Sequence, residues 1–380
     1  MLAMDNRAWW IWLQNALGAG TSKHTRILEH YLSVQAFYEA GERAWKAEKY
    51  LTPRELGKLK RFSPEAAEAQ LSYAEKLGQQ ILTPDMPAYP EKLHVLPDYP
   101  CVLYIQGQLP PVDFLLSVSM VGTRKATDDG LSAAYQFGRA LAKAGAIVVS
   151  GGALGIDTQA HRGALAADGY TICVLGCSLE NDYLVANAKL REQIARTGAL
   201  VTEYPPGTAA WPANFPIRNR IISGLSDAVL VVEAAARSGA LITAHNALDQ
   251  GREVFAVPGS VTNPMARGTN ALLLDGCPPA TCPADILRCF QTRYHVRMPM
   301  EEALPVEECT RPIASAEPLP PKDLSEDAAA LYAALMTEPQ SVDALCAASG
   351  LPVERLLTAV TELELRGLAT GASGQRYRRS

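Results

Sequence analysis

The feature that most constrains the fold is a strict alternation of short apolar runs and helical windows between residues 85 and 295. Each run is apolar on both faces, as a strand buried in a parallel sheet should be. Strands that alternate with helices predict a doubly wound α/β domain with a mostly parallel sheet. The predicted strands are Ser117–Val121, Ile147–Ser150, Thr171–Leu175, Leu200–Thr202, Ala228–Glu233 and Val254–Val257. The predicted helices between them are Leu131–Ala144, Thr158–Ala167, Asn187–Arg196 and Leu241–Gln250.

Three further regions flank this domain along the sequence. Residues 1–80 contain short helical segments broken by glycine and proline, and Ser63-Pro64 marks one helix start. We expect a small helical domain there, of the SAM or helix–hairpin–helix type. Residues 297–324 are rich in proline and glutamate and predict an extended linker. Residues 325–380 predict a helix–turn–helix followed by a hairpin, which is a winged helix.

The would-be recognition helix of this winged helix, Val353–Arg366, is more acidic than basic. Glu354, Glu362 and Glu364 outnumber its arginines. A net-negative helix enters a major groove poorly. We therefore favour protein contact or support of an oligomer over DNA reading for this domain, and both alternatives stay open.

Length and composition limit the classes of protein to consider. A chain of 380 residues predicts two or three domains, at about 100–200 residues per domain. The net charge of -5 means that any nucleic-acid site must be a local basic patch on an acidic body. The apolar run Trp9–Leu13 is too short for a signal peptide or a membrane span and predicts an amphipathic helix of a soluble domain.

The eight cysteines are scattered and form no CxxC pair. That spacing fits neither a disulfide framework nor a zinc site. We expect buried, reduced thiols, which suit the cytoplasm, and no bound metal.

Two predicted strands are followed directly by residues suited to anion binding. After the first strand, Gly122 permits a sharp turn, and Arg124 and Lys125 stand where ligands of α/β sheets bind. The alternative is that both cations are simply solvated on a loop.

The second strand leads into a glycine loop that opens a helix. Ser150, Gly151 and Gly152 let backbone amides approach a phosphate, with the helix N-terminus behind them. The loop has neither the GxGxxG of a dinucleotide site nor the GK[ST] of an NTP-binding loop. By itself it is a weak signal.

A third cluster lies where a helix is expected to begin, before the predicted strand Ala228–Glu233. Arg218 and Arg220 suit bidentate phosphate contacts, and Asn219 adds a donor or acceptor. Phe215 is suited to stack on a base, or else to fill the core beneath a surface helix.

The remaining candidates are polar residues near strand and helix ends. Ser238 and Gly239 precede another helix and form a further anion-type site. Asp157 and His161 share one helix face, where a capping aspartate bonded to a structural histidine is favoured over a hydrolytic or metal pair. For Glu233 we favour bonding to loop amides over catalysis, because no second acid matches it. We therefore predict no catalytic residues and no cofactor.

Several longer segments together resemble one known family. They are GTR after the first strand, SGGALGIDTQAHRGAL, TEYPPG, FPIRNRIISGLSDAVLVVEA, SGALITAHNAL, GREVFAVPGS and GTNALLLDG. In this order they closely resemble the DNA-processing protein A (DprA/Smf) family over residues 85 to 290. The flanking helical and winged-helix regions agree with longer members.

The resemblance implies a Rossmann-like domain that binds single-stranded DNA without cutting it. It further implies loading of the RecA recombinase during natural transformation, homodimers formed through the Rossmann-like domain, and single-strand-binding protein as a further candidate partner. Carried over by position, the DNA contacts include Lys189, because Asn187–Leu190 resembles the family's YPxxNxxL. The chain departs there, since Tyr183 is followed by Leu184 rather than proline and Glu180 stands where aspartate is usual.

Two other classes of protein compete with this interpretation. A phosphoribohydrolase-type enzyme is expected to carry the motif PGGxGTxxE, which the chain lacks. Ser150–Asp157 is only weakly similar to that motif. A transcriptional regulator would bind duplex DNA through residues 325–380, against which the acidic helix argues.

Overall fold

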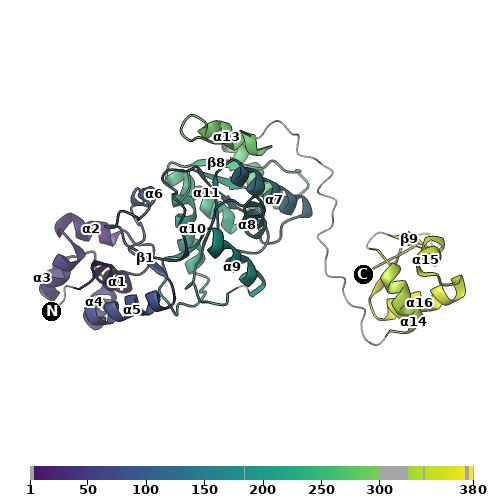
Figure 1. Ribbon diagram of the computed structural model, residues 1–380, viewed down its shortest axis with the longest axis horizontal. Coiled ribbons are helices and arrows are strands. Elements are labelled where there is room, and N and C mark those ends of the chain that lie inside the picture. The colour runs from purple at the N-terminus through teal and green to yellow at the C-terminus, as the bar shows by residue number, and fades with distance from the viewer. Residues whose placement is uncertain (1–3, 184, 299–323, 337–338, 373–375, 380) are drawn as a thin grey trace. The chain divides into compact units, whose positions relative to one another are not determined.

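The computed structural model describes residues 4–183, 185–298, 324–336, 339–372 and 376–379 (Figure 1). The chain divides into two compact units, Met1–Leu304 and Pro305–Ser380, and each is described by itself. The linker predicted over residues 297–324 falls almost wholly outside the described residues.

The larger unit is built around an eight-stranded sheet with the strand order β1-β2-β6-β5-β4-β3-β7-β8. The pairs β1–β2 and β2–β6 are antiparallel, and every other pair is parallel. The strands are β1 Gln80–Leu82, β2 Leu103–Gly107, β3 Ser117–Val121, β4 Ile147–Ser150, β5 Thr171–Val174, β6 Ala199–Thr202, β7 Ala228–Val231 and β8 Glu253–Ala256.

The predicted doubly wound, mostly parallel sheet is confirmed, and all six predicted strands are present with small shifts at their ends. Strands β1 and β2 were not predicted from the sequence. Both come before the first predicted strand, and β1, with only three residues, is the edge strand of the sheet and pairs with β2. Two outer residues of β2 are exposed, so neither strand shows the continuous apolar run of a buried parallel strand.

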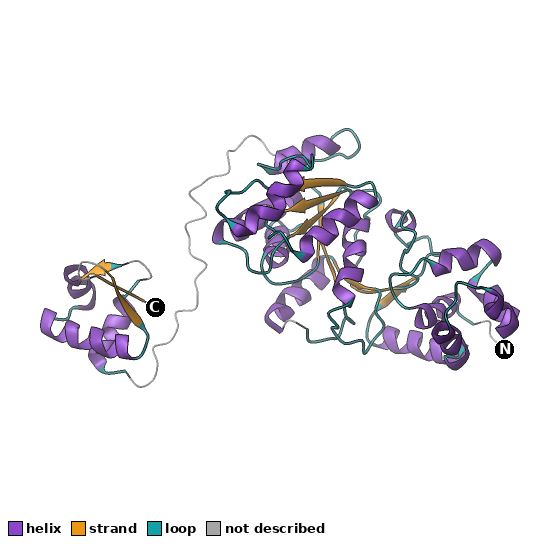
Figure 2. Cartoon of the chain, turned by 180° about the vertical axis from the view of Figure 1, so that it is seen from behind, coloured by secondary structure: helices purple, strands orange, loops and turns teal. Residues whose placement is uncertain are grey.

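Helices cover both faces of the sheet (Figure 2). Alternate strand residues point to opposite layers, so that Val118 and Val148 pack in one core while Ile147 and Val149 pack in the other. The first layer holds α7 Asp128–Lys143, α8 Ile156–Ala166 and α13 Pro283–Phe290, with α9 Ala188–Thr197 beside α8. The second layer holds α6 Glu91–His94, α10 Asn214–Gly224, α11 Gly239–Asp249 and α12 Arg267–Leu274. Two short 3-10 helices, η1 Val185–Asn187 and η2 Pro264–Ala266, complete the unit.

The N-terminal region is helical, and it does not have a core of its own. Its helices are α1 Asn6–Leu17, α2 Lys23–His30, α3 Val34–Ala47, α4 Pro53–Arg61 and α5 Pro64–Lys76. Ile11 and Trp12 belong to the same hydrophobic cluster as Tyr104 of β2 and Cys173 of β5. The helices therefore pack against the sheet through one continuous core.

The prediction that Trp9–Leu13 forms an amphipathic helix is wrong. The segment is helical, but Trp9, Trp10 and Trp12 are all buried, because α1 lies between the other helices and the sheet. A helix that is apolar all round is a buried helix. The helix start predicted at Ser63 is confirmed, since the Ser63 side chain accepts a hydrogen bond from the backbone N–H of Ala66.

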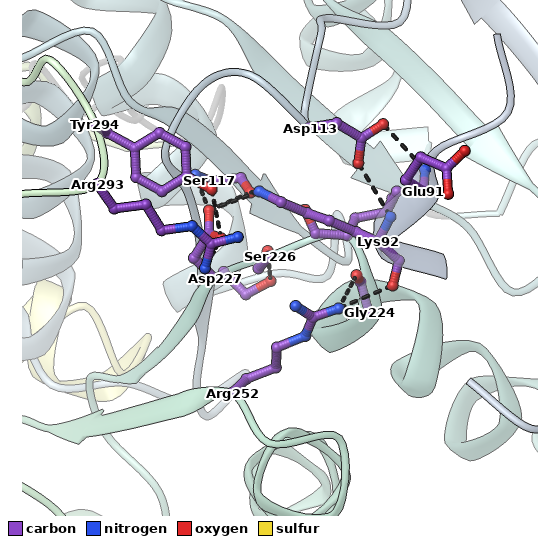
Figure 3. A network of polar contacts seen from close by, with 12 residues as sticks. Glu91, Lys92, Asp113, Ser117, Gly224, Ser226, Asp227, Arg252, Arg293 and Tyr294 are labelled. Atoms are coloured by element: carbon purple, nitrogen blue, oxygen red, sulfur yellow. Dashed lines mark hydrogen bonds and ion pairs between the residues drawn. The ribbon is translucent and has the colours of Figure 1, made fainter. Parts of the chain in front are cut away.

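A buried polar network joins five segments at the amino ends of the strands (Figure 3). Lys92 Nζ lies 2.6 Å from Asp227 Oδ2 and 2.8 Å from Ser117 Oγ. The Tyr294 hydroxyl donates to Asp227 Oδ1 at 2.8 Å, and Arg252 donates to the Lys92 carbonyl at 2.8 Å. Burial lowers the pKa of Lys92, and the Asp227 charge opposes that shift. The network holds together α6, β3, the starts of β7 and β8, and the segment after α13.

All seven described cysteines are free thiols. Cys101, Cys173, Cys177 and Cys277 are buried as predicted, whereas Cys289 is exposed at the end of α13.

The smaller unit is a winged helix. Its elements are α14 Glu326–Ala334, β9 Gln340–Ser341, α15 Val342–Ser349, α16 Val353–Leu365, β10 Ala369–Ala372 and β11 Arg376–Arg379, with strand order β10-β11-β9. Both arginines of the acidic α16 region are paired, Arg355 with Asp327 and Arg366 with Glu362. The exposed cations of this unit include Arg376 and Arg378 on β11, which the sequence analysis did not weigh.

We expect Asp227→Ala to destabilise the larger unit by about 3–5 kcal/mol, because it leaves the Lys92 ammonium buried without its partner. Urea unfolding followed by circular dichroism measures the loss. Adding Lys92→Met to the same variant should restore much of it. A single-variant loss below about 1 kcal/mol would show that the network does not hold these segments together.

Candidate nucleic-acid interface

The candidate interface lies at the carboxyl ends of the central strands. Gly122 follows β3, and a Cβ there would lie 2.4 Å from Ile156 Cγ1, so only glycine permits this close turn. Arg124 and Lys125 come next, and both are exposed. Among the described contacts neither has an acidic partner. Two uncompensated cations thus stand at the edge where α/β sheets bind ligands.

Phe215, in the first turn of α10, is the centre of the cluster. The guanidinium carbons of Arg124 and Arg218 each lie 5.7 Å from its ring centroid. The Tyr183 ring lies 5.0 Å from it at a tilt of 40°. Phe215 also contacts the backbone at Gly176, where a Cβ would meet the ring at 3.0 Å. The aromatic rings and Arg124 thus meet at one partly exposed place that suits both stacking and charge.

Arg218 lies beneath the surface rather than on it. Only 5% of it is exposed, and its Nη1 donates to the Gly151 carbonyl at 2.8 Å and also to the Val174 carbonyl. Burial lowers its pKa, and Asp157 is the largest opposing influence. Arg218 therefore ties the ends of β4 and β5 to α10 and adds positive potential from below.

The glycine loop is shaped by tight packing. The Ser150 hydroxyl is buried and donates to the Met120 carbonyl at 2.6 Å. Gly152 has a φ of 68°, and a Cβ there would lie 2.5 Å from Cys173 Sγ. A Cβ on Gly151 would lie 2.8 Å from Arg218 Nη1. The loop needs glycine for its own packing, whatever binds it.

Asp157 and His161 do not form the expected pair. Asp157 accepts from the Ala153 backbone N–H at 3.3 Å, while His161 Nδ1 bonds Thr171 Oγ1 at 2.7 Å. Burial raises the pKa of Asp157 to about 6, and burial lowers that of His161 to about 3. Both side chains have structural partners, and the expectation of a direct bond between them is wrong.

Of the remaining predicted residues, Asn219 and Ser238 bond the backbone at the start of α11, whereas Lys189 is exposed. Asn219 Nδ2 donates to the Gly239 carbonyl at 3.3 Å, which joins α10 to α11. The Ser238 side chain caps α11 by accepting from the Ala240 N–H. Lys189 is exposed near the start of α9.

Glu233 accepts hydrogen bonds from two loops, in agreement with the structural role that was favoured over catalysis. Its carboxylate accepts from the Thr127 backbone N–H at 2.9 Å, from the Thr127 hydroxyl at 2.6 Å and from Asn263 Nδ2 at 3.2 Å.

Arg220 requires a correction, because it does not face the predicted interface. Only 6% of it is exposed, and it pairs with Glu203 at 2.7 Å and with Asp98 at 3.1 Å. It lies two positions from Arg218, so the two side chains leave α10 on different sides. A phosphate cannot reach Arg220 without breaking these ion pairs.

Further exposed aromatic and cationic residues, not predicted from the sequence, lie at this edge. Tyr183 stacks near Phe215, and Trp211, in the loop before α10, is 65% exposed. Arg237 after β7 and Arg267 at the start of α12 are exposed at the same edge of the sheet. An exposed tryptophan beside a predicted phosphate site is the signal that could have found this surface.

The described residues also lack two further features. They contain no helix long and apolar enough to cross a membrane. Nor do they gather three or more His, Cys, Asp or Glu side chains in a way that could hold a metal ion.

Fold and site together define a Rossmann-like protein with a cation- and aromatic-rich sheet edge and an appended winged helix. The chain matches the family DNA recombination-mediator protein A over residues 80–291 and the DprA winged helix domain over residues 315–375. It belongs to this DprA/Smf family.

Relatives extend the match to the whole chain. Protein Smf of Synechocystis sp. is 33% identical over 100% of both chains, and protein Smf of Escherichia coli is 36% identical over 85% of this chain and 84% of its own. The structure of DNA processing protein A from Streptococcus pneumoniae has a TM-score of 0.61 at 29% identity, covering 76% of this chain and 98% of that one. DNA processing protein A from Helicobacter pylori, which binds single-stranded DNA, has a TM-score of 0.52 at 32% identity, covering 57% and 98%.

The surroundings of Arg220 predict an acid-sensitive junction. His24 of α2 is buried against Tyr99, and burial, followed by the Arg220 charge, lowers its pKa to about 4. Because the folded state resists protonation, the stability from neutral His24 is present above pH 6.5 and is lost as the pH falls toward 4. The loss amounts to about 3 kcal/mol.

We expect the difference in unfolding free energy between wild type and His24→Gln to shrink by that amount between pH 7 and pH 4. Denaturant melts across this range measure it, and His245→Gln, at an exposed site on α11, is the control. A constant difference would contradict the prediction.

Proposed function

We propose that this protein binds single-stranded DNA along the carboxyl edge of the sheet, does not cut it, and helps to load a RecA recombinase onto it during natural transformation. The observation that carries the proposal is the Phe215 cluster, where two arginines and Tyr183 surround one partly exposed ring. Bases stack on aromatic faces regardless of sequence, while cations hold the phosphates.

The distribution of charge supports the same proposal. Exposed cations follow several strands at this one edge while the whole chain carries a net charge of -5. The cations are Arg124, Lys125, Lys189, Arg237 and Arg267. Such a series fits an extended phosphate chain better than one small nucleotide. The single-stranded DNA binding of the Helicobacter pylori relative, which shares the fold, points the same way.

In this proposal the buried carboxylates are structural. Glu233 holds Thr127 and Asn263, and Asp157 lies under the glycine loop beside Arg218. The proposal therefore assigns no catalytic residue and no cofactor. Release of free base from a nucleoside monophosphate by the purified chain would favour the phosphoribohydrolase alternative instead.

We expect Arg124→Ala and Phe215→Ala each to weaken single-strand binding about tenfold or more, from lost phosphate attraction and lost base stacking. Fluorescence anisotropy with labelled single-stranded and duplex oligonucleotides measures the effect. Arg139→Ala is the matched control, because Arg139 is exposed on α7 toward the opposite edge of the sheet.

The same variants test delivery to the recombinase. Wild type should shorten the lag of RecA ATP hydrolysis on DNA coated with single-strand-binding protein, and Arg124→Ala should not. If Arg124→Ala and Phe215→Ala bound single-stranded DNA as tightly as the control Arg139→Ala, the proposal that DNA binds at this edge would be wrong.

We further propose that the chain forms a cytoplasmic homodimer through the surface around α11 and α12. Large apolar side chains are exposed there, with Ile242 40%, Leu248 48%, Val261 87% and Leu274 89% accessible. These four side chains come from residues 242–274, and exposed apolar groups that lie together on a surface are typical of an interface.

We expect Leu274→Arg to shift the protein from dimer to monomer in light scattering, because it places a charge in the proposed apolar contact. Leu32→Arg, at a fully exposed leucine of the helical region, is the control and should leave the mass unchanged. A monomeric wild type, or a dimeric Leu274→Arg, would contradict this surface.

A further inference from the structure

The helical region carries an open hollow that the sheet-edge site does not use. Its volume is about 430 Å³, and it is lined by Asn15, Arg54, Lys58, Arg61 and Phe62. We call this feature the α4 hollow. Three of its five lining residues are cations, and none is acidic.

The cations come from one face of one helix. Arg54, Lys58 and Arg61 are spaced four and three residues apart on α4, so they form a stripe. At 1.5 Å per residue the stripe is about 10 Å long. Gly57 lies within it, and a Cβ there would come 3.7 Å from Arg61 Nη2. Glycine inside an exposed helix costs stability and leaves the middle of the stripe open.

The charges of the stripe are uncompensated. None of the ion pairs between described residues involves Arg54, Lys58 or Arg61. The carboxylate on α4, Glu55, is occupied by Lys23 at 2.7 Å and by the Thr52 cap. This contrasts with Lys60 on the same helix, which pairs with Glu42.

The rest of the lining suits a nucleotide better than an acidic peptide. Phe62 is half-buried and offers an aromatic surface beside the cations. The Asn15 amide nitrogen is already bonded to the Ile11 carbonyl and to Gln70, which leaves its carbonyl oxygen as an acceptor for a base amino group. Cation, aromatic ring and amide acceptor match phosphate and base together.

The hollow and the sheet-edge site lie in the same compact unit. Tyr183, which stacks near Phe215, also packs against the hydrophobic cluster that contains α1. The sheet edge and the helical region thus adjoin one shared core, and a strand must cross the surface between them to reach both sites. The α4 hollow is then available to a longer strand and out of reach of a short one.

We propose that the α4 hollow is a second phosphate-backbone site, which binds the same single-stranded DNA beyond the sheet edge. The inference rests on the proposed function and adds a second contact to it. Its loss should leave binding of the shortest bound oligonucleotide unchanged. It should weaken binding of longer ones and reduce their salt dependence, because fewer counterions are released.

The experiment compares two triple variants of the full chain with equal net charge. Arg54→Ala/Lys58→Ala/Arg61→Ala empties the stripe. Arg43→Ala/Lys46→Ala/Lys49→Ala removes three exposed cations of the same region that do not line the hollow. Anisotropy titrations over a series of oligonucleotide lengths and salt concentrations give affinity and salt slope. Thermal melts check that both variants remain folded.

We expect the first variant to bind long oligonucleotides at least tenfold more weakly than wild type at low salt. Its slope of log K against log salt should be shallower by about 2, since three contacts contribute about 0.7 each. The control variant should follow wild type. Hydrogen exchange of wild type should show residues 53–62 protected by a long oligonucleotide and not by a short one.

Equal long-strand binding by both variants, or no protection of residues 53–62, would overturn the second site. Polyglutamate provides a further test. If it protected residues 53–62 from hydrogen exchange and oligonucleotides of every length did not, the hollow would bind acidic protein instead. A wild type that binds no oligonucleotide of any length would refute the proposed function itself, which separates the two failures.

Discussion

The two arginines buried on different sides of α10 set the geometry of the larger unit. A buried guanidinium needs a partner, because an unpaired buried charge costs several kcal/mol. Arg218 meets that demand at the backbone carbonyls of Gly151 and Val174, and Arg220 meets it at Glu203 and Asp98. The helix is thereby fixed to the ends of β4 and β5 on one side and to the segments after β6 and before β2 on the other. Phe215, one turn earlier, is presented at the surface as a consequence.

This arrangement separates the residues that hold the interface from the residues that meet the ligand. Arg218, Ser150 and Glu233 are buried and bonded within the protein. Arg124 and Lys125 are exposed and unpaired among the described residues. A buried, bonded base under exposed cations suits a strand that must be bound without regard to its sequence. It also explains how an acidic chain can present a basic edge.

The sequence was sufficient to predict the central sheet. Buried parallel strands such as Ile147–Ser150 are continuous apolar runs between helical windows, and that pattern is independent of what packs outside it. It was not sufficient for β1 and β2, which are short and lie at an edge. Nor did it show that the Trp9–Leu13 segment of α1 is buried on all sides, because that depends on packing by segments distant in the chain.

For the candidate site, the sequence predicted which segments converge but not which way each side chain points. Arg218 and Arg220 look equivalent in the motif, yet both are buried and only Arg218 lies under the predicted edge. The deciding partners, Glu203 and Asp98, are remote in sequence and cannot be read from local spacing. The resemblance identified the family, while the separate roles of the two arginines required the tertiary structure.

The core shared by the helical region and the sheet has a kinetic consequence for the thiols it contains. Cys101, Cys173 and Cys177 all lie in the cluster that joins α1 to β5. Because burial raises their pKa values, they are poor nucleophiles until water reaches them. Water reaches them only when the helices and the sheet separate. The rate at which a thiol reagent modifies these three cysteines therefore reports how often that junction opens. The measurement needs no introduced label, because the cysteines are native to the chain.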